Sequence, residues 1–339
     1  MNKFIRFAGF AFLLVILAGC RFQREVLIEG STMGTTYHIK VVAGYFSTTS
    51  DLKEKIDGCL KEINGSMSTY AADSEISRFN SIRNTEEDVA VSEDFFNVLK
   101  ASEKLYRLTN GTWDGTVKPL VDVWGFGSPP VQRKVPSKEH IDRLLAEVGF
   151  NHIEISENRH IRKKKSSLSL DLNSIAKGYA VDRVAAVIRK NGFENFLVEI
   201  GGEVFASGVK KDRQPWRVGI NRPLKDAPAN QVYRVLTLQD AALATSGDYR
   251  NFFEIEGRRY SHVLDPMTGY PVRNSVVSVS VIADTCMFAD GLATALMVMG
   301  PDKGLELVER LDHVEAMIVI QQADGTLVDY FSKGFKVLQ

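Results

Sequence analysis

The sequence predicts an α+β protein built from mixed, largely antiparallel sheets with helices packed against them. The chain has 339 residues, of which 44% are hydrophobic and 25% charged, a composition typical of a globular protein with a sizeable core. Segments with strand-like alternation and segments with helical spacing are interspersed, but they do not repeat as strict strand–helix–strand units. A doubly wound parallel sheet needs such units, so the pattern favours the α+β class.

The first 30 residues are expected to be a targeting segment and a tether. Two basic residues lie within the first six positions, an apolar stretch covers 7–17, and the small-residue sequence LAGC ends at Cys20. This order resembles a bacterial lipoprotein signal, in which residues 1–19 are removed and Cys20 is lipidated. An ordinary signal peptide or a short anchor is the alternative. Residues 20–30 would then form a lipidated cysteine and tether, and the protein would work outside the cytoplasm.

The first half of the folded region is predicted to contain one strand and three helices. Ser50 and Ser92 are residue types that cap helix N-termini, and Gly111 and Gly149 follow the ends of helical patterns. The expected elements are a strand over 31–43, a helix after Ser50, a helix from Ser92 to about Thr109, and a helix over 138–148.

The second half is predicted to alternate between hairpins and apolar helices. A hairpin is expected over 152–171, with the basic run RKKK at 162–165 on a solvated edge that discourages strand pairing. A helix over 173–191 should stop at Gly192. The other expected elements are strands at 195–200, 203–209, 216–221, 232–238, 251–264 and 275–283, apolar helices at 286–299 and 301–311, and strands at 314–321 and 326–331.

The charge balance argues against a nucleic-acid-binding surface, and the cysteine spacing argues against a cysteine metal site. Lysine plus arginine and aspartate plus glutamate both number 42, so no global basic field favours nucleic acid. The two cysteines after Cys20 are Cys59 and Cys286, and they lack the spacing of a metal site. Two buried free thiols are expected, although an oxidising compartment also permits a bridge.

An acid and a hydroxyl share one face of the apolar helix predicted after Thr285, its expected N-cap. Asp290 and Thr294 are four residues apart, so they lie one turn apart on the same face. A buried carboxylate needs a partner. Hydrogen bonds to a neighbouring loop would supply one, and so would a hard cation of the Mg²⁺ type held by oxygen ligands. The spacing alone leaves both readings open.

A histidine ends the strand before the turn DPMTG. His262 lies three residues before Asp265, and the glycine and proline that follow favour a tight turn. A hydrogen-bonded histidine in a turn is one interpretation, and a general base beside a phosphate-binding loop is the other.

The glycine-rich segments and the aromatic residues in loops are weaker indications of a ligand-binding site. The pieces GSTMGT, GGE and TSGDY match neither the Walker A pattern nor the dinucleotide fingerprint, and each alone is usually a turn. Tyr70, Trp113 and Trp124 lie in polar loops, where a planar ligand could stack, although partial burial is the common fate of such residues.

Taken in order, these stretches resemble the FAD:protein FMN transferases, the ApbE family. The resemblance rests on eight motifs, spread from about Ser31 to the C-terminus: GSTMGT, MSTYAADSEISRFN, GTWDGTVKPLVDVWGFG, DLNSIAKGYAVD, EIGGEV, ATSGDY, SHVLDPMTGYPV and ADGLATALMVMG. It implies a single catalytic unit with two lobes over residues 31–339, related to the T-fold.

The resemblance also implies an activity. Such an enzyme binds FAD and Mg²⁺, moves the FMN moiety onto a threonine hydroxyl of an acceptor protein, and releases AMP. Typical acceptors are flavosubunits of membrane redox pumps, of the Na⁺-translocating NADH:quinone reductase or Rnf type. Such acceptors favour the periplasmic side of the inner membrane for a lipid-anchored protein. An Mg²⁺-dependent FAD pyrophosphatase and a non-catalytic FAD-binding lipoprotein are the alternatives.

Roles for individual residues follow from the resemblance alone. His262 matches the position of the base, and the metal ligands would be the backbone carbonyl of Ser174 with Asp290 and Thr294. Some family members carry a further acid where this chain has Ala293. The residues expected to contact the flavin nucleotide are Met33, Tyr70, Thr112, Trp113, Asp114, Asp171, Lys177 and Leu264.

Overall fold

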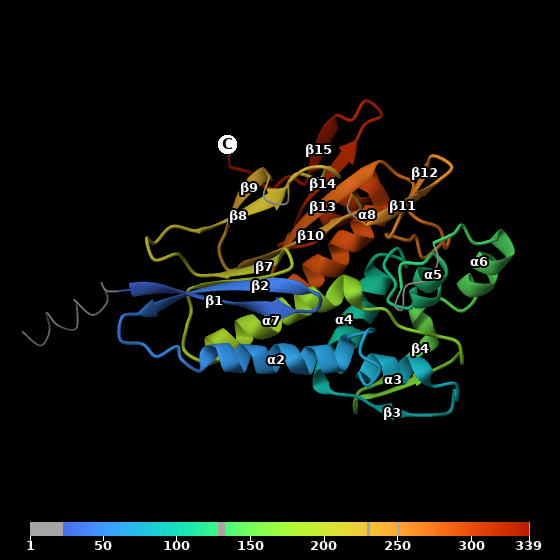
Figure 1. The fold of residues 1–339 in the computed structure, drawn as a ribbon, viewed down its shortest axis with the longest axis horizontal. Helices are drawn as coiled ribbons and strands as arrows, with labels where there is room; N and C mark the ends of the chain where they lie inside the picture. Colours follow the sequence, from blue (N-terminus) through green and yellow to red (C-terminus); the bar gives the residue numbers. More distant parts are fainter. Residues whose placement is uncertain (1–22, 128–132, 229–230, 250, 339) are drawn as a thin grey trace, which may run out of the picture.

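The computed structural model describes residues 23–127, 133–228, 231–249 and 251–338, and an eight-stranded sheet forms its centre (Figure 1). Every pair of neighbouring strands in it is antiparallel, as the sequence predicts. In spatial order the strands are β1 (Gln23–Thr32), β2 (Thr35–Gly44), β6 (Phe196–Ile200), β7 (Glu203–Ser207), β10 (Ala241–Gly247), β13 (Val276–Ala283), β14 (Glu315–Gln321) and β15 (Leu327–Phe331).

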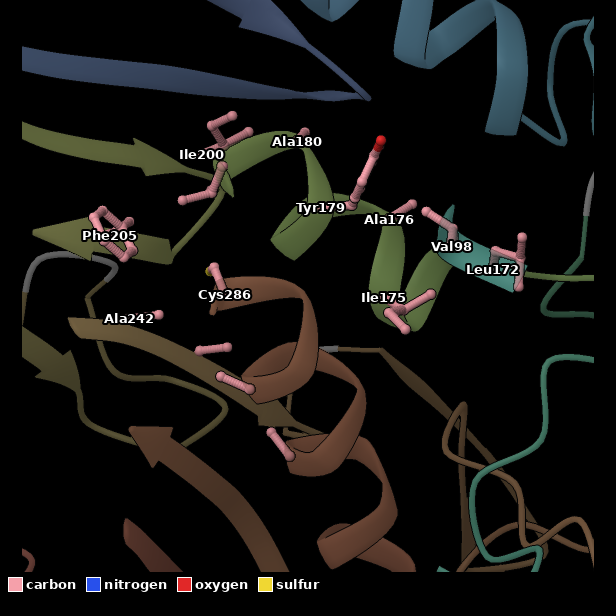
Figure 2. Close-up of a cluster of buried hydrophobic side chains, with 14 of the residues drawn as sticks. Val98, Leu172, Ile175, Ala176, Tyr179, Ala180, Ile200, Phe205, Ala242 and Cys286 are labelled. Carbon is pink, nitrogen blue, oxygen red and sulfur yellow. The ribbon is translucent and has the colours of Figure 1, made fainter. Parts of the chain in front are cut away.

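Two long helices pack together and against this sheet, and they form the main hydrophobic core with it. They are α7 (Asn173–Lys190) and α8 (Cys286–Val308), and the helices α2 (Leu52–Met67) and α4 (Glu93–Leu108) pack on α7. Figure 2 shows the contact, with Ala176 and Ala180 on α7 and Cys286 at the first turn of α8. The backbone of α8 breaks at Gly300, where φ is +77°, so the two helices predicted at 286–299 and 301–311 follow one another directly.

Two smaller clusters complete the interior. The hairpin of β8 (Trp216–Asn221) and β9 (Val232–Leu238) packs Trp216 and Leu236 against sheet residues such as Val204. A third cluster is built around Leu120, Trp124 and Tyr260. It joins α5 (Lys118–Val123), α6 (Lys138–Leu145) and the hairpin of β11 (Phe252–Ile255) and β12 (Arg258–Ser261).

A three-stranded sheet corrects the prediction made for the basic run. Its order is β3 (Val89–Ala90), β5 (His160–Lys163) and β4 (Ile153–Ser156), so β5 is the central strand rather than an edge. Lys163 is only 2% exposed, and its Nζ donates to the carbonyl oxygens of Asn80 (3.3 Å) and Ile82 (3.0 Å). Burial lowers the pKa of this amine to about 8. The strand ends at Lys163, so the hairpin is shorter than the expected 152–171.

Three further strand predictions were wrong or incomplete. Residues 23–30, expected as tether, belong to β1, and Met33 and Gly34 turn the chain into β2 with φ of +49° and +73°. On the outer side of β1 the apolar Leu27 lies exposed between Glu25 and Glu29, and it interrupts the alternation of polar and apolar residues. The segment 251–264 is itself a hairpin, β11–β12. Strand β10 was not predicted, because AALATSG is rich in small residues of weak strand propensity.

Most helix predictions are confirmed within a few residues, because capping is local. The side chain of Ser92 accepts the amide of Phe95 (3.2 Å) at the start of α4. Asp51 rather than Ser50 is the N-cap of α2, and α6 ends at Leu145 rather than Val148. The short helices α3 (Glu75–Ser81) and α5 and the 3-10 turn Phe150–His152 were not predicted.

Cys59 and Cys286 are free and buried, as expected. Within the described ranges, no helix is both long and apolar enough to cross a membrane. Cys20 and the expected lipoprotein signal lie outside the described residues.

Candidate active site

One cavity of about 500 Å³ gathers the residues that the sequence singled out. It lies where the β1–β2 turn, the start of α7, the middle of α8 and the segment after β12 meet. This volume falls in the range of small-molecule sites. Twelve predicted site residues line it: Met33, Tyr70, Thr112, Trp113, Asp114, Asp171, Ser174, Lys177, His262, Leu264, Asp290 and Thr294.

The start of α7 forms part of the cavity wall, where Asp171, Asn173 and Ser174 are among the lining residues. Asp171 accepts the amide of Asn173 on its Oδ1 (2.9 Å), and its own amide donates to the carbonyl of Gly115 (2.8 Å). Burial raises the pKa of the Asp171 carboxyl. A helix N-terminus carries partial positive charge, so this end of α7 suits a phosphate or another anion.

Three charged side chains form a cluster in the cavity wall, of which Glu203 and Asp290 are buried and Lys177 is partly exposed. The Nζ of Lys177 forms an ion pair with Oε1 of Glu203, whose other oxygen, Oε2, is buried and accepts no hydrogen bond from the described residues. Burial alone would lower the pKa of Lys177, but the carboxylates of Asp290 and Glu203 outweigh it and raise that pKa. Burial also raises the pKa of Glu203. Lys177 therefore pairs with Glu203 and also lies in the electrostatic field of Asp290.

Asp290 and Thr294 face the cavity from the same side of α8, as their spacing predicted. Oδ2 of Asp290 accepts the amide of Gly178 (3.0 Å), and Oγ1 of Thr294 lies 3.0 Å from Oγ of Ser246. The partner of Asp290 is thus helix backbone rather than a neighbouring loop. In a regular helix the Gly178 amide donates to the carbonyl of Ser174, so its bond to Asp290 competes for that donor.

These groups fit a hard cation such as Mg²⁺. The cavity groups beside Asp290 include the hydroxyl of Thr294 and the carboxylate of Glu203, whose Oε2 accepts no hydrogen bond from the described residues. No group of three or more His, Cys, Asp or Glu side chains suited to a metal occurs in the described part of the chain. Mg²⁺ commonly uses one or two carboxylates together with substrate phosphates and water, so this sparse set is compatible with it. Ala293 supplies no acid here and is fully buried.

The contact between α7 and α8 sets the position of Asp290. Thr285 is the N-cap of α8, but its side chain makes no capping bond. Instead the carboxylate of Asp182 on α7 accepts the amides of Cys286 and Met287 (both 2.8 Å), and burial raises its pKa to about 6. A carboxylate at a helix N-terminus is stabilising. Gly178 permits the close approach, since a Cβ there would lie 2.3 Å from the carbonyl oxygen of Cys286.

Gly178→Ala is therefore expected to destabilise the protein by about 1–3 kcal/mol, the usual cost of overpacking. The matched control is Gly58→Ala, inside α2, where an added Cβ meets nothing within 4 Å. That change should stabilise by up to about 1 kcal/mol through helix propensity. Urea unfolding of the two variants gives the comparison. Equal stabilisation by both substitutions would contradict a tight α7–α8 contact.

His262 is held as a neutral imidazole with one nitrogen free to accept a proton. Its Nδ1 lies 3.0 Å from the carbonyl oxygen of Asn251, which can only accept, so Nδ1 carries the hydrogen and Nε2 does not. Burial lowers the pKa of His262, and the charge of Arg259 lowers it further. Asp265, the neighbouring acid, accepts the amide of Met267 within the turn (2.8 Å). This assignment of hydrogens makes His262 suitable as a general base at neutral pH.

The aromatic residues divide between the cavity mouth and the core. Tyr70 is 73% exposed and lines the cavity, so its ring is available for stacking. Trp113 is buried, and its Nε1 donates to Oγ of Ser174 (3.0 Å), which steadies the start of α7. Trp124 is fully buried, donates to the carbonyl of Gly269 (2.8 Å), and does not line the cavity. Stacking of a planar ligand therefore stays a prediction for Tyr70, and it is wrong for Trp124.

Thr112 and Asp114 shape the loop before α5. The hydroxyl of Thr112 donates to the carbonyl of Thr109 (3.0 Å). Asp114 accepts the amide and hydroxyl of Thr116 (2.8 and 2.7 Å) and the amide of Phe150 (3.2 Å), and burial raises its pKa to about 6. With its carboxylate bonded in this way, Asp114 presents mainly loop backbone to a ligand.

Glu203 and Ser246 are cavity residues that sequence reasoning missed. Glu203 follows the glycine pair of GGE, and Ser246 lies in TSGDY, both of which were interpreted as turns. An acid beginning a fully buried strand, as Glu203 begins β7, was the available signal.

Comparison with known proteins shows which chains this one is similar to. Residues 33–318 match the ApbE family. An FAD:protein FMN transferase of Vibrio cholerae is 43% identical over 325 residues, covering 95% of this chain and 96% of that protein. One from Escherichia coli K12 is 37% identical, covering 84% and 81%.

Two solved structures are also similar to this chain over most of its length. The flavin transferase ApbE from Vibrio cholerae superposes with a TM-score of 0.83 at 41% identity, covering 92% of this chain and 98% of that one. The apo form of the Pseudomonas stutzeri flavinyl transferase ApbE gives 0.82 at 37% identity, covering 92% and 95%.

Proposed function

The chain belongs to the ApbE family, and from this membership and the cavity we propose that it is an FAD:protein FMN transferase. It moves the FMN moiety of FAD to a threonine hydroxyl of an acceptor flavoprotein subunit and releases AMP. The observation that carries the proposal is a neutral histidine with a free Nε2 in the same cavity as the Asp290–Thr294 oxygen pair.

The reaction is a phosphoryl transfer. The threonine oxygen attacks the phosphorus on the FMN side of the pyrophosphate, a new P–O bond forms, and the bond to the AMP phosphate breaks. The hydroxyl proton passes to Nε2 of His262. The start of α7 and the ammonium of Lys177 orient the phosphates and offset their charge. Mg²⁺, when bound through Asp290, Thr294 and the Ser174 carbonyl, would stabilise charge developing on the phosphate oxygens.

Two rival functions use the same cavity. If water replaces threonine, the products are FMN and AMP, and the protein is an Mg²⁺-dependent FAD pyrophosphatase. A lipoprotein that only binds FAD would need no base, so His262 argues against that alternative.

The test is incubation of the purified protein with FAD, Mg²⁺ and a candidate acceptor subunit, followed by mass spectrometry. We expect a covalent FMN adduct on an acceptor threonine and one AMP per adduct. An acceptor whose threonine is replaced by alanine is the control. Free FMN with AMP and no adduct would indicate the pyrophosphatase, and intact FAD would indicate the binding protein.

The location and partners belong to the same proposal. The LAGC segment supports a lipid anchor on Cys20, and the expected acceptors favour the periplasmic side of the inner membrane. Acceptors there would be flavosubunits of redox pumps, of the Na⁺-translocating NADH:quinone reductase or Rnf type. The balanced charge of the sequence gives no basic field that would support a nucleic-acid partner.

A further inference from the structure

The start of α7 is held in place by groups from outside the helix. Its N-cap residue is Leu172, and the apolar side chain makes no capping bond. The residues before it, 164–171, lie outside strands and helices, so their backbone groups need other partners. Asp171, Asn173 and Ser174 line the cavity, and the position of this segment therefore sets the shape of the site.

A side-chain amide from the last turn of α3 supplies such partners. Nδ2 of Asn80 donates to the carbonyl of Leu170 (2.9 Å), and Oδ1 of Asn80 accepts the amide of the same residue (2.7 Å). Leu170 is thus paired as it would be with a neighbouring antiparallel strand. The next residue, Asp171, donates its amide to the carbonyl of Gly115 (2.8 Å). Two distant segments therefore hold the chain immediately before α7.

Asn80 is itself fixed by a buried lysine. Nζ of Lys163, in the central strand β5, donates to the carbonyls of Asn80 (3.3 Å) and Ile82 (3.0 Å). Arg83 also donates to the carbonyl of Asn80 (2.8 Å). Carbonyls at a helix C-terminus carry partial negative charge, which suits these two cations. Lys163, which the proposed reaction does not use, therefore fixes the residue that holds Leu170.

The other end of α3 is tied to the mouth of the cavity. Ser74, the N-cap of α3, accepts the amide of Ser77 (3.1 Å), and its hydroxyl donates to the carbonyl of Ser68 (2.7 Å). Tyr70, which lines the cavity, donates its amide to Oγ of Ser68 (3.3 Å). The segment 68–80 thus connects the exposed aromatic residue with the start of α7.

We propose that Asn80 is a positioning residue for FAD, which acts by holding Leu170 and thereby the Asp171–Ser174 segment against the phosphates. This role rests on the proposed function, which assigns the start of α7 to the pyrophosphate. Asn80 is not among the residues that line the cavity, so it acts through the backbone and not by contact with the nucleotide. Small displacements of groups that orient a substrate have large effects on its binding and reaction.

The test compares Asn80 with an asparagine that makes the same kind of bond elsewhere. Asn195 is also half-buried, and its Oδ1 accepts the amide of Val209 (2.8 Å). Like Asn80, it does not line the cavity, so neither substitution removes a lining group. Asn80→Ala, Asn80→Asp and Asn195→Ala are examined by urea unfolding, by fluorescence titration with FAD, and by hydrogen exchange of peptides that cover residues 168–175.

We expect Asn80→Ala to weaken FAD binding by about tenfold or more, because two hydrogen bonds to Leu170 are lost. Hydrogen exchange over residues 168–175 should become faster in the same variant. Asn195→Ala should lower the stability without changing either measurement. Asn80→Asp keeps an oxygen for the amide of Leu170 but loses the donor to its carbonyl, so its FAD affinity should be intermediate.

Asn80→Asp also serves as the test if Asn80→Ala does not fold. Unchanged FAD affinity in the Asn80 variants that fold, or an equal loss of affinity in Asn195→Ala, would overturn the role of Asn80. If the unmodified protein binds FAD but transfers no FMN, the proposed function fails, and weaker binding by the Asn80 variants still supports the positioning role. An unmodified protein that binds no FAD would overturn both.

Discussion

Replacing His262 by asparagine is expected to slow FMN transfer by about 10²–10⁴-fold, the usual contribution of a general base. Asparagine is similar in size and keeps a group that can bond the carbonyl of Asn251. The loss should therefore appear in turnover, with FAD affinity close to that of the unmodified protein. Single-turnover transfer and FAD binding are measured on one preparation, with His38→Asn, on the charged outer face of β2, as the control.

The pH dependence of the transfer rate is a second test of His262 as the general base. Burial lowers the pKa of His262 from 6.5, so the neutral base form persists to lower pH than in an ordinary histidine. The rate should fall only as the pH drops below 6.5, and this acid limb should vanish in His262→Asn. Near wild-type transfer by the variant would reject His262 as the base. Equal loss of binding and transfer would instead assign it to positioning the cofactor.

Asp290→Asn is expected to reduce Mg²⁺-dependent transfer by about 10²-fold or more, because a bound cation supplies several kcal/mol and each 1.36 kcal/mol is tenfold in rate. The asparagine oxygen can still accept the amide of Gly178, so the α7–α8 contact is kept. The negative charge that would hold the cation is lost. Lys177 then has only Glu203 as a carboxylate partner in the cluster.

The measurements are turnover across a series of Mg²⁺ concentrations and calorimetric Mg²⁺ binding in the presence of FAD. The control is Asp302→Asn, at an exposed acid farther along α8. This substitution should change neither turnover nor Mg²⁺ binding. Removal of Mg²⁺ with a chelator should reduce the unmodified protein to the level of the Asp290→Asn variant. Full activity of Asp290→Asn in buffer with limiting Mg²⁺ would exclude Asp290 from the metal site.

Predictions that depended on neighbours in the sequence succeeded. The cap at Ser92 and the end of α7 before Gly192 involve contacts within a few residues, so spacing and residue type are enough to find them. Asp290 and Thr294 lie on one side of α8 for the same reason. Strand boundaries were less accurate, since an edge strand such as β1 is recognised only by its partner.

The sequence by itself determined the α+β class, the longer helices and the family resemblance, and it singled out twelve residues that meet in one cavity. Only the tertiary structure decided the charge partners, the histidine tautomer and the burial of the side chains. Glu203 reaches Lys177 across 26 positions, and Asp182 caps α8 across more than 100. The bond from Nδ1 of His262 to Asn251 leaves Nε2 as the acceptor, and Lys163 is buried despite its basic neighbours. Charge, tautomer and burial depend on groups brought together from distant positions, and local spacing does not specify them.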